Sequence, residues 1–286
     1  MAKRKAPQVK PPLDPESETW NKIPWRKREK HCFRIQRRIF RASQRGNTRA
    51  VHKLQKVLMK SQAARLLAVR RVTQDTRGKK TAGIDGVKSV KPAGHLVMAN
   101  HIHPKNWQAA SPPVRRVWIP KPGKAEKRPL GIPIMEERAR QHLARLALEP
   151  EWEARFDPNS YGFRPGRLCH DAVEAIFNAI KQKDKYVLDA DLKGAFDTIN
   201  HQALRNKLNT SPAMKRAIQG GTISPLLRNV AFHGMETTVM EAFRPKEGKP
   251  PFIRYVDDLV VFHATEEGEK ERKQSWKRGS PTGDWN

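Results

Sequence analysis

The sequence predicts a mixed α+β fold in which helices alternate with short strands. Apolar residues recur at helical spacing in several segments, whereas short β-branched and aromatic runs are bounded by Pro, Gly and Asp. Helices and short strands that alternate in this way are typical of an α+β domain. The chain has 286 residues, which is enough for one large or two ordinary domains.

The charge distribution predicts a polyanionic partner. The formal net charge is +28, and residues 1–80 hold 24 basic and 5 acidic residues, so that segment alone carries +19. An excess of this size favours nucleic acid over an anionic membrane surface. The sequence contains no apolar run that would span a bilayer, and the basic N-terminus lacks the apolar core of a secretory signal. We therefore expect a cytoplasmic or organellar protein that is not secreted.

Two segments near the N-terminus have the periodicity of amphipathic helices, over residues 31–46 and 48–74. In the second segment, Val51, Leu54 and Leu58 fall on one face. A basic helix face is often only a solvated surface. Here almost no acid is interleaved, which favours RNA binding by the exposed basic side chains. These side chains are Arg37, Arg38, Arg41, Lys53, Lys56 and Lys60.

The remaining elements follow in order along the chain. A Gly-rich basic loop over residues 75–88 precedes a Pro-rich passage with little periodicity that reaches Pro113. Apolar residues 117–119, a turn at Pro122 and Gly123, and a second strand that ends at Pro133 predict a hairpin with a basic tip. Periodicity then predicts helices over residues 135–156, 169–182 and 201–209, with a strand from residue 186 to residue 191 between the last two.

Acidic residues occur where two of the predicted strands end or turn. Asp191 ends the run from residue 186, and Asp257 and Asp258 lie inside the apolar stretch FIRYVDDLVVF. An exposed hairpin turn would tolerate such acids. A bound cation would also compensate them, and converging carboxylates are the ligands that Mg²⁺ prefers. Two such ions stabilise the attacking and leaving oxygens of a displacement at phosphorus.

Four stretches follow one another along the chain, namely WIPKPGKAEKRPLGIP, YVLDADLKGAFDTINH, QGGTISPLLRNV and RYVDDLVVFH. The first resembles a fingers block and the others resemble palm blocks of a group II intron-encoded reverse transcriptase, of the maturase type found in bacteria and organelles. The resemblance implies a right-hand polymerase with fingers and a partial palm, preceded by a helical basic region. It also implies a magnesium-dependent RNA-directed DNA polymerase, a nucleotidyltransferase encoded by a mobile element. Its partners would be intron RNA or an RNA template, a DNA primer and deoxynucleoside triphosphates, with no membrane.

The resemblance also assigns roles to individual residues. Lys121 and Arg128 correspond to positions that hold the triphosphate of the incoming nucleotide, although a solvated hairpin tip is the alternative. Phe196 corresponds to the residue that crowds the sugar 2′ position, and core packing is its alternative. Gln219 corresponds to the loop that backs nucleotide and template. The catalytic carboxylates that hold the two Mg²⁺ ions correspond to Asp191, Asp257 and Asp258.

Two departures from the family pattern lower the expected activity. The helix over residues 201–209 leads almost directly to Gln219, which predicts an internal deletion in the palm, and the sequence after His263 lacks the next family block, which predicts that the thumb is absent. Two functions therefore stay open, an impaired polymerase and a catalytically inactive RNA-binding remnant. The expected regions are a disordered basic arm (1–18), an N-terminal reverse transcriptase region (19–95), fingers and partial palm (96–263) and a polar tail outside the family (264–286).

Overall fold

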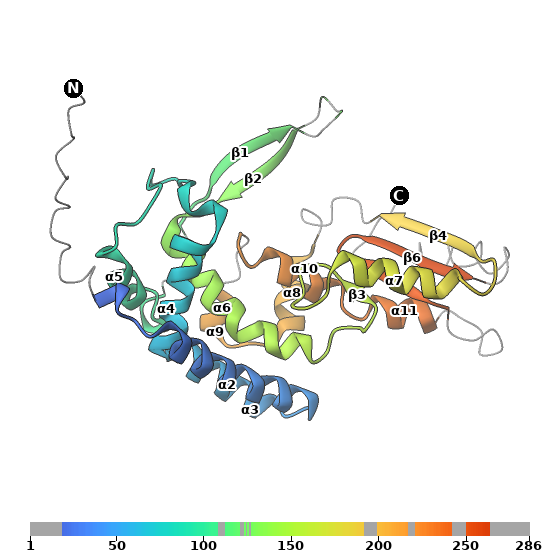
Figure 1. The fold of residues 1–286 in the computed structure, drawn as a ribbon, viewed down its shortest axis with the longest axis horizontal. Coiled ribbons are helices and arrows are strands. Elements are labelled where there is room, and N and C mark those ends of the chain that lie inside the picture. The colour runs from blue at the N-terminus through green and yellow to red at the C-terminus, as the bar shows by residue number, and fades with distance from the viewer. Residues whose placement is uncertain are drawn as a thin grey trace, which may run out of the picture.

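The computed structural model describes residues 19–107, 112–120, 123, 125, 127–191, 199–216, 221–241 and 250–263. These residues form an elongated molecule with a helical body at one end and a β-sheet at the other, and a two-stranded hairpin projects between them (Figure 1). The mixture of helices and strands confirms the predicted α+β class. The predicted arm and the predicted tail lie outside the described residues.

The first helical region is divided more finely than its periodicity predicts. The segment over residues 48–74 breaks at Ser61, whose extended backbone ends one helix and whose hydroxyl accepts a hydrogen bond from the Ala64 amide of the next at 3.1 Å. The passage before Pro113 also contains a short helix, although its sequence has little periodicity. The elements are α2 (Trp25–Gln44), α3 (Thr48–Lys60), α4 (Gln62–Arg70), η1 (Arg71–Asp75), η2 (Arg77–Lys80), α5 (Gly94–His101) and η3 (Pro104–Asn106).

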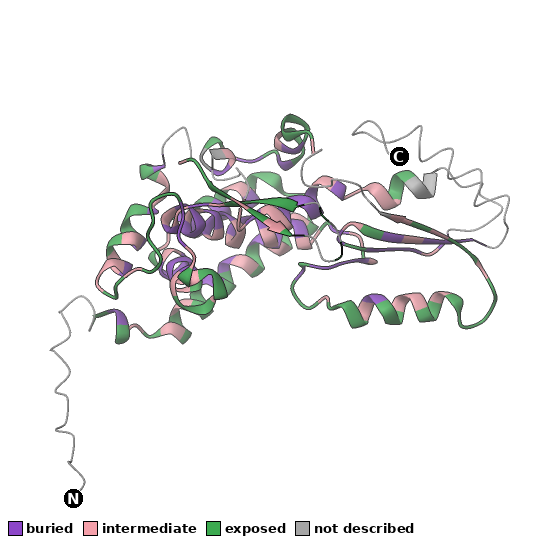
Figure 2. Cartoon of the chain, turned by 90° about the horizontal axis from the view of Figure 1, so that it is seen from above, coloured by how far each residue is buried: buried purple, intermediate pink, exposed green. Residues whose placement is uncertain are grey.

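The core of the helical body surrounds one long helix, α6 (Met135–Glu153). Two acidic residues in its first turn, Glu136 and Glu137, stabilise the helix because their negative charges lie at the positive end of the helix dipole. Helices α2, α3 and α4 pack against α6, and buried residues gather there (Figure 2). Ala139 and Ala147 are completely buried on α6, and such small side chains allow the neighbouring helices to approach closely. Among the described residues, no helix has the length and apolar content needed to cross a membrane.

The strands form two sheets. The predicted hairpin is present as β1 (Arg115–Pro120) and β2 (Lys127–Ile132), paired antiparallel. The second sheet has the order β3-β5-β6-β4, with β3 parallel to β5 and the other neighbours antiparallel. Its strands are β3 (Ser160–Tyr161), β4 (Tyr186–Asp191), β5 (Phe252–Tyr255) and β6 (Asp258–His263).

Helices pack on both faces of the four-stranded sheet. Helix α7 (Cys169–Ile180) packs on one face, where Ala172 contacts the cluster that contains Ile253 and Phe262. On the other face, Phe252 and Val261 pack with a residue of α10. This alternation follows from the period of two along each strand. The remaining helices are α8 (His201–Leu208), α9 (Pro212–Arg216), α10 (Ser224–Phe232) and α11 (Met235–Glu241).

Candidate active site

Strand register brings the backbone of three acidic residues to one end of the sheet. β4 and β6 pair so that Asp191 is directly opposite Asp258. Residues opposed in this way have Cα atoms about 4.5–5.5 Å apart. Tyr255 is also opposite Asp258, so Val256 and Asp257 form the two-residue turn between β5 and β6. This acidic turn (Val256–Asp258) therefore lies beside the end of β4.

The acidic turn has a backbone conformation that depends on its neighbours. Val256 has φ +63°, a left-handed conformation that is unusual for a β-branched residue. Its amide donates to the Tyr161 carbonyl at 3.2 Å, and its carbonyl accepts from Arg254 Nη1 at 2.9 Å. The Val256 side chain also packs on Gly162, where a Cβ would lie 2.3 Å from Val256 Cγ2. Gly162 is thus required both by this approach and by its own φ of +80°.

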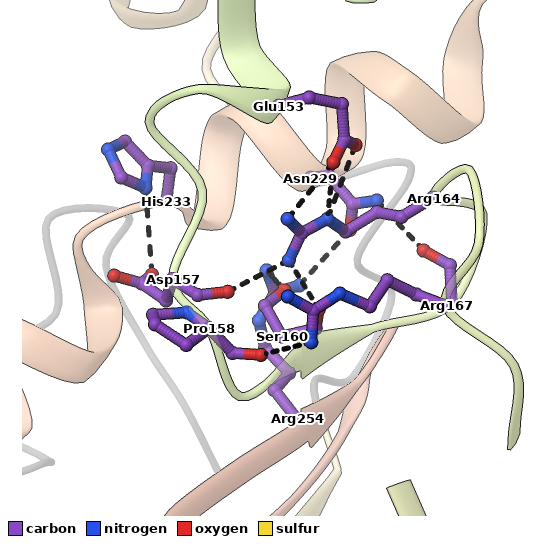
Figure 3. A network of polar contacts seen from close by, with 10 residues as sticks. Glu153, Asp157, Pro158, Ser160, Arg164, Arg167, Asn229, His233 and Arg254 are labelled. Atoms are coloured by element: carbon purple, nitrogen blue, oxygen red, sulfur yellow. Dashed lines mark hydrogen bonds and ion pairs between the residues drawn. The ribbon is translucent and has the colours of Figure 1, made fainter. Parts of the chain in front are cut away.

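A buried polar network anchors the turn to the body of the protein (Figure 3). Arg254 is buried, and besides the Val256 carbonyl it donates to Ser160 Oγ and to Asn229 Oδ1. Asn229, on α10, donates in turn to the Gly162 carbonyl at 3.0 Å. These bonds join β5 and α10 to β3, which lies more than 60 residues earlier in the chain.

A second buried arginine extends the network toward α6. Arg164 pairs with Glu153 at 3.0 Å and donates to the carbonyls of Asp157 and Ser160 (Figure 3). Burial raises the pKa of Glu153, an effect that its hydrogen bond from Arg164 opposes. Burial lowers the pKa of Arg254 to about 10, so its guanidinium is still charged at neutral pH. Satisfied buried charges of this kind specify one geometry, because each displaced group would lose its partners.

The loop that precedes α10 is fixed by α6. Gly221 has φ +98°, and a Cβ there would lie 2.6 Å from Gln141 Oε1 and 2.8 Å from Pro133 Cγ. The Thr222 amide donates to the same Gln141 oxygen at 2.8 Å. The predicted nucleotide-loop residue Gln219 lies outside the described residues, but the end of its loop is held against α6.

A further contact positions the Gly-rich basic loop over residues 75–88. Arg138, at the start of α6, donates to the carbonyls of Gly78 and Thr81 at 2.9 and 2.7 Å and to the Pro133 carbonyl. Burial lowers the pKa of Arg138. This arginine thus joins the basic loop to the base of the β1–β2 hairpin, a role that its helical sequence context does not indicate.

The residues predicted to contact the nucleotide are described only in part. Arg128 is exposed on β2, opposite Ile119 of β1. Lys121 and Phe196 lie outside the described residues, and the side chain of Asp191 is not described. Among the described side chains, no group of three or more His, Cys, Asp and Glu is placed to hold a metal ion. The predicted three-carboxylate site therefore stays a prediction.

The basic surface predicted on the first helices is exposed. Helices α2 and α3 lie side by side along the edge of the helical body (Figure 1). Their apolar residues, such as Ile39 and Leu58, are completely buried, which turns the basic faces outward. The six predicted RNA-binding side chains are all exposed, namely Arg37, Arg38, Arg41, Lys53, Lys56 and Lys60.

Comparison with known proteins places this arrangement in a family. Residues 20–102 match the N-terminal domain of reverse transcriptase, and residues 119–278 match the reverse transcriptase (RNA-dependent DNA polymerase) family. Protein YkfC of Escherichia coli K12 is 29% identical over 207 residues, which are 60% of this chain and 54% of that protein.

Intron-encoded and maturase-like proteins are also similar to the chain. The group II intron-encoded protein LtrA of Lactococcus lactis is 32% identical over 154 residues, 45% of this chain and 26% of LtrA. Maturase-like protein 1 of Euglena gracilis is 29% identical over 243 residues, 74% of this chain and 51% of that protein. The chain thus spans about half the length, or less, of these relatives. Because the second family match covers more than half of its residues, the chain belongs to the reverse transcriptase family and is homologous to group II intron proteins.

Proposed function

We propose that this chain supplies the fingers and palm of a group II intron-type RNA-directed DNA polymerase, in which Asp191, Asp257 and Asp258 hold two Mg²⁺ ions. The observation that carries the proposal is the register that sets Asp191 opposite Asp258, with Asp257 in the adjoining turn. Family membership supports it, because copying RNA into DNA is the reaction for which the family is named.

The residues at the turn have the right chemistry for Mg²⁺. Their donors are carboxylate oxygens, which Mg²⁺ prefers together with water and substrate phosphates. When bound, the ions would stabilise the oxygen that attacks the α-phosphorus and the oxygen that leaves with pyrophosphate. The protein's part is positioning, for which the network of Arg254, Asn229 and Gly162 gives the turn a single backbone geometry.

Four residues complete the proposed nucleotide site. Lys121 and Arg128 at the hairpin would offset the charge of the triphosphate. Phe196 would exclude a ribose 2′-hydroxyl and so select deoxynucleotides, and Gln219 would lie behind the incoming nucleotide. The proposed template is an RNA strand, and the proposed primer is a DNA strand to which the reaction adds deoxynucleotides.

Primer extension tests the polymerase proposal. The purified chain is incubated with an RNA template, a DNA primer, deoxynucleoside triphosphates and Mg²⁺, beside an Asp257→Ala/Asp258→Ala variant. Extension that requires Mg²⁺ and disappears in the double variant supports the assignment. Extension that survives in the double variant would remove the acidic turn from the mechanism.

A second candidate function is RNA binding without polymerisation. The exposed basic faces of α2 and α3 favour it, because phosphate contacts by Lys and Arg supply most non-specific affinity for nucleic acid. Binding of structured RNA by a chain that extends no primer, under any of the Mg²⁺ conditions above, distinguishes this function from the first.

A further inference from the structure

Beyond the proposed reaction, we propose that Arg228 is a built-in counter-ion of Asp257 that competes with divalent cations and thereby sets the metal affinity of the acidic turn. The inference rests on the proposed metal site at Asp191, Asp257 and Asp258, and it concerns what opposes metal binding there. It assigns a role to a residue whose position in the sequence, inside the stretch SPLLRNV, carries no sign of metal chemistry.

The contact that carries the inference joins α10 to the acidic turn. Arg228 Nη1 lies 3.1 Å from Asp257 Oδ1, a charge-assisted hydrogen bond between two ionised groups. The Arg228 side chain is only 6% exposed, whereas that of Asp257 is 36% exposed. The arginine therefore reaches the carboxylate from the protein interior, and solvent or a ligand reaches the same carboxylate from outside.

The surroundings keep Arg228 in this position. It lies among buried residues of α10, next to Asn229, which is itself bonded to the Gly162 carbonyl. Behind it, Arg254 is close enough that the positive charge of Arg228 contributes to lowering the Arg254 pKa, after the larger effect of burial. Asp257 therefore faces a positively charged interior whose arginines are held by the fold.

This arrangement opposes metal binding in two ways. A cation that coordinates Oδ1 of Asp257 must displace the guanidinium N–H, and one that coordinates the other oxygen meets a fixed positive charge a few ångströms away. Because such coupling is reciprocal, a cation that does bind also weakens the pair between Arg228 and Asp257. Removal of the arginine charge should therefore tighten metal binding, whereas a purely supporting arginine would weaken it when removed.

The experiment measures Mn²⁺ binding by the full chain, using the electron paramagnetic resonance signal of free Mn²⁺ in a titration. The variants are Arg228→Gln, which is polar but shorter and uncharged, and Asp257→Ala, which defines the binding that belongs to the turn. Arg155→Gln is the control, since it breaks a pair of 3.4 Å between Arg155 and Glu151 of α6, which lies outside the turn. Circular dichroism establishes that each variant is folded.

We expect Arg228→Gln to bind Mn²⁺ at the Asp257-dependent site at least tenfold more tightly than the unaltered chain, and Arg155→Gln to match the unaltered chain. Equal affinity in Arg228→Gln and the unaltered chain would overturn the competition while leaving the metal site intact. Weaker binding in Arg228→Gln would also overturn it, because the arginine would then support the ion. Absence of any Asp257-dependent binding in all chains would overturn this inference together with the proposed metal site.

Loss of the fold in Arg228→Gln does not prevent the test. Arg228→Lys keeps a buried positive charge but has a shorter reach and no planar fork, so its pair with Asp257 is weaker. Tighter Mn²⁺ binding in this variant than in the unaltered chain supports the competition. Unchanged or weaker binding contradicts it.

Discussion

Gly162 packs directly against Val256 of the acidic turn, and no residue larger than glycine fits at position 162. A Cβ on Gly162 would lie 2.3 Å from Val256 Cγ2, far inside the closest approach of two carbon atoms. The contact couples the loop after β3 to the left-handed residue of the turn, so the position of Asp257 depends on a glycine 95 residues earlier in the chain.

Gly162→Ala should destabilise the protein by roughly 2–5 kcal/mol, the sum of a left-handed conformation for alanine and a steric overlap. Gly166→Ala is the control, because Gly166 has a similar positive φ of +66° but a Cβ added there would meet no atom within 4 Å. It should lose only about 1–2 kcal/mol. Urea unfolding of both variants measures the difference, and equal losses would show that the contact with Val256 is not tight.

Arg254→Met should destabilise the protein by about 3 kcal/mol, because several buried acceptors lose a charged donor at once. Arg254→Lys should restore little of this stability, since a single ammonium group cannot reach Ser160, Asn229 and the Val256 carbonyl together. Arg145→Gln serves as a control because its partly exposed pair with Glu149 on α6 is worth only about 0.3–0.5 kcal/mol. Full recovery by lysine would mean that charge alone, without the hydrogen bonds, stabilises the network.

The elements were more predictable from sequence than the contacts that position them. The β1–β2 hairpin, α6, α7 and the strand that ends at Asp191 follow from consecutive residues with a clear period. Helix α5 has only His95 and Ala99 buried, which is too short a pattern to indicate a helix. The division at Ser61 depends on one capping hydroxyl within an otherwise continuous helical pattern.

The polar network could not be predicted, for a physical reason. The local sequence around each of these residues gives no sign of burial or of a polar partner. Arg254, for example, is a charged residue in a strand, a type that is usually exposed. Its partners Ser160 and Asn229 are 94 and 25 residues away, so only the folded chain brings them within hydrogen-bond distance. The same holds for Arg228, whose contact with Asp257 spans 29 residues.

Acid should destabilise the protein through His142. Burial, with the charges of Arg145 and Arg71, lowers the pKa of His142 to about 3, against an ordinary value of 6.5. Between these two values the unfolded chain binds the proton and the folded chain does not, so stability falls as the pH drops below about 6.5, by at most 1.4 kcal/mol per pH unit from this group. Urea unfolding at pH 7.5, 6 and 5 measures the loss, which should be smaller in His142→Gln; identical pH profiles would contradict the assignment.

The basic face of α3 should contribute to RNA affinity in a salt-dependent manner. In the unaltered chain, log affinity should fall linearly with log salt, by roughly 0.7–0.9 for each phosphate contacted. Substitution of Lys53, Lys56 and Lys60 by Glu should weaken RNA binding and reduce the slope of log affinity against log salt. The control changes to Glu three lysines in the connection between α7 and β4, namely Lys181, Lys183 and Lys185. An equal effect of both triple changes would show that net charge, and not the α3 face, determines binding.

Binding and copying should be separable in this chain. We expect weak primer extension by the unaltered protein, because Arg228 holds Asp257 and because only 15 residues, which include the short helix α9, separate the end of α8 at Leu208 from the start of α10 at Ser224. Small errors in the positions of reacting groups reduce phosphoryl-transfer rates strongly.

Asp257→Ala/Asp258→Ala should abolish the remaining extension while RNA affinity stays the same or rises slightly, since two negative charges are removed. Filter binding and primer extension on the same preparations test this, and a parallel loss of RNA binding in the double variant would mean that the acidic turn, and not the basic helices, organises the nucleic-acid interface.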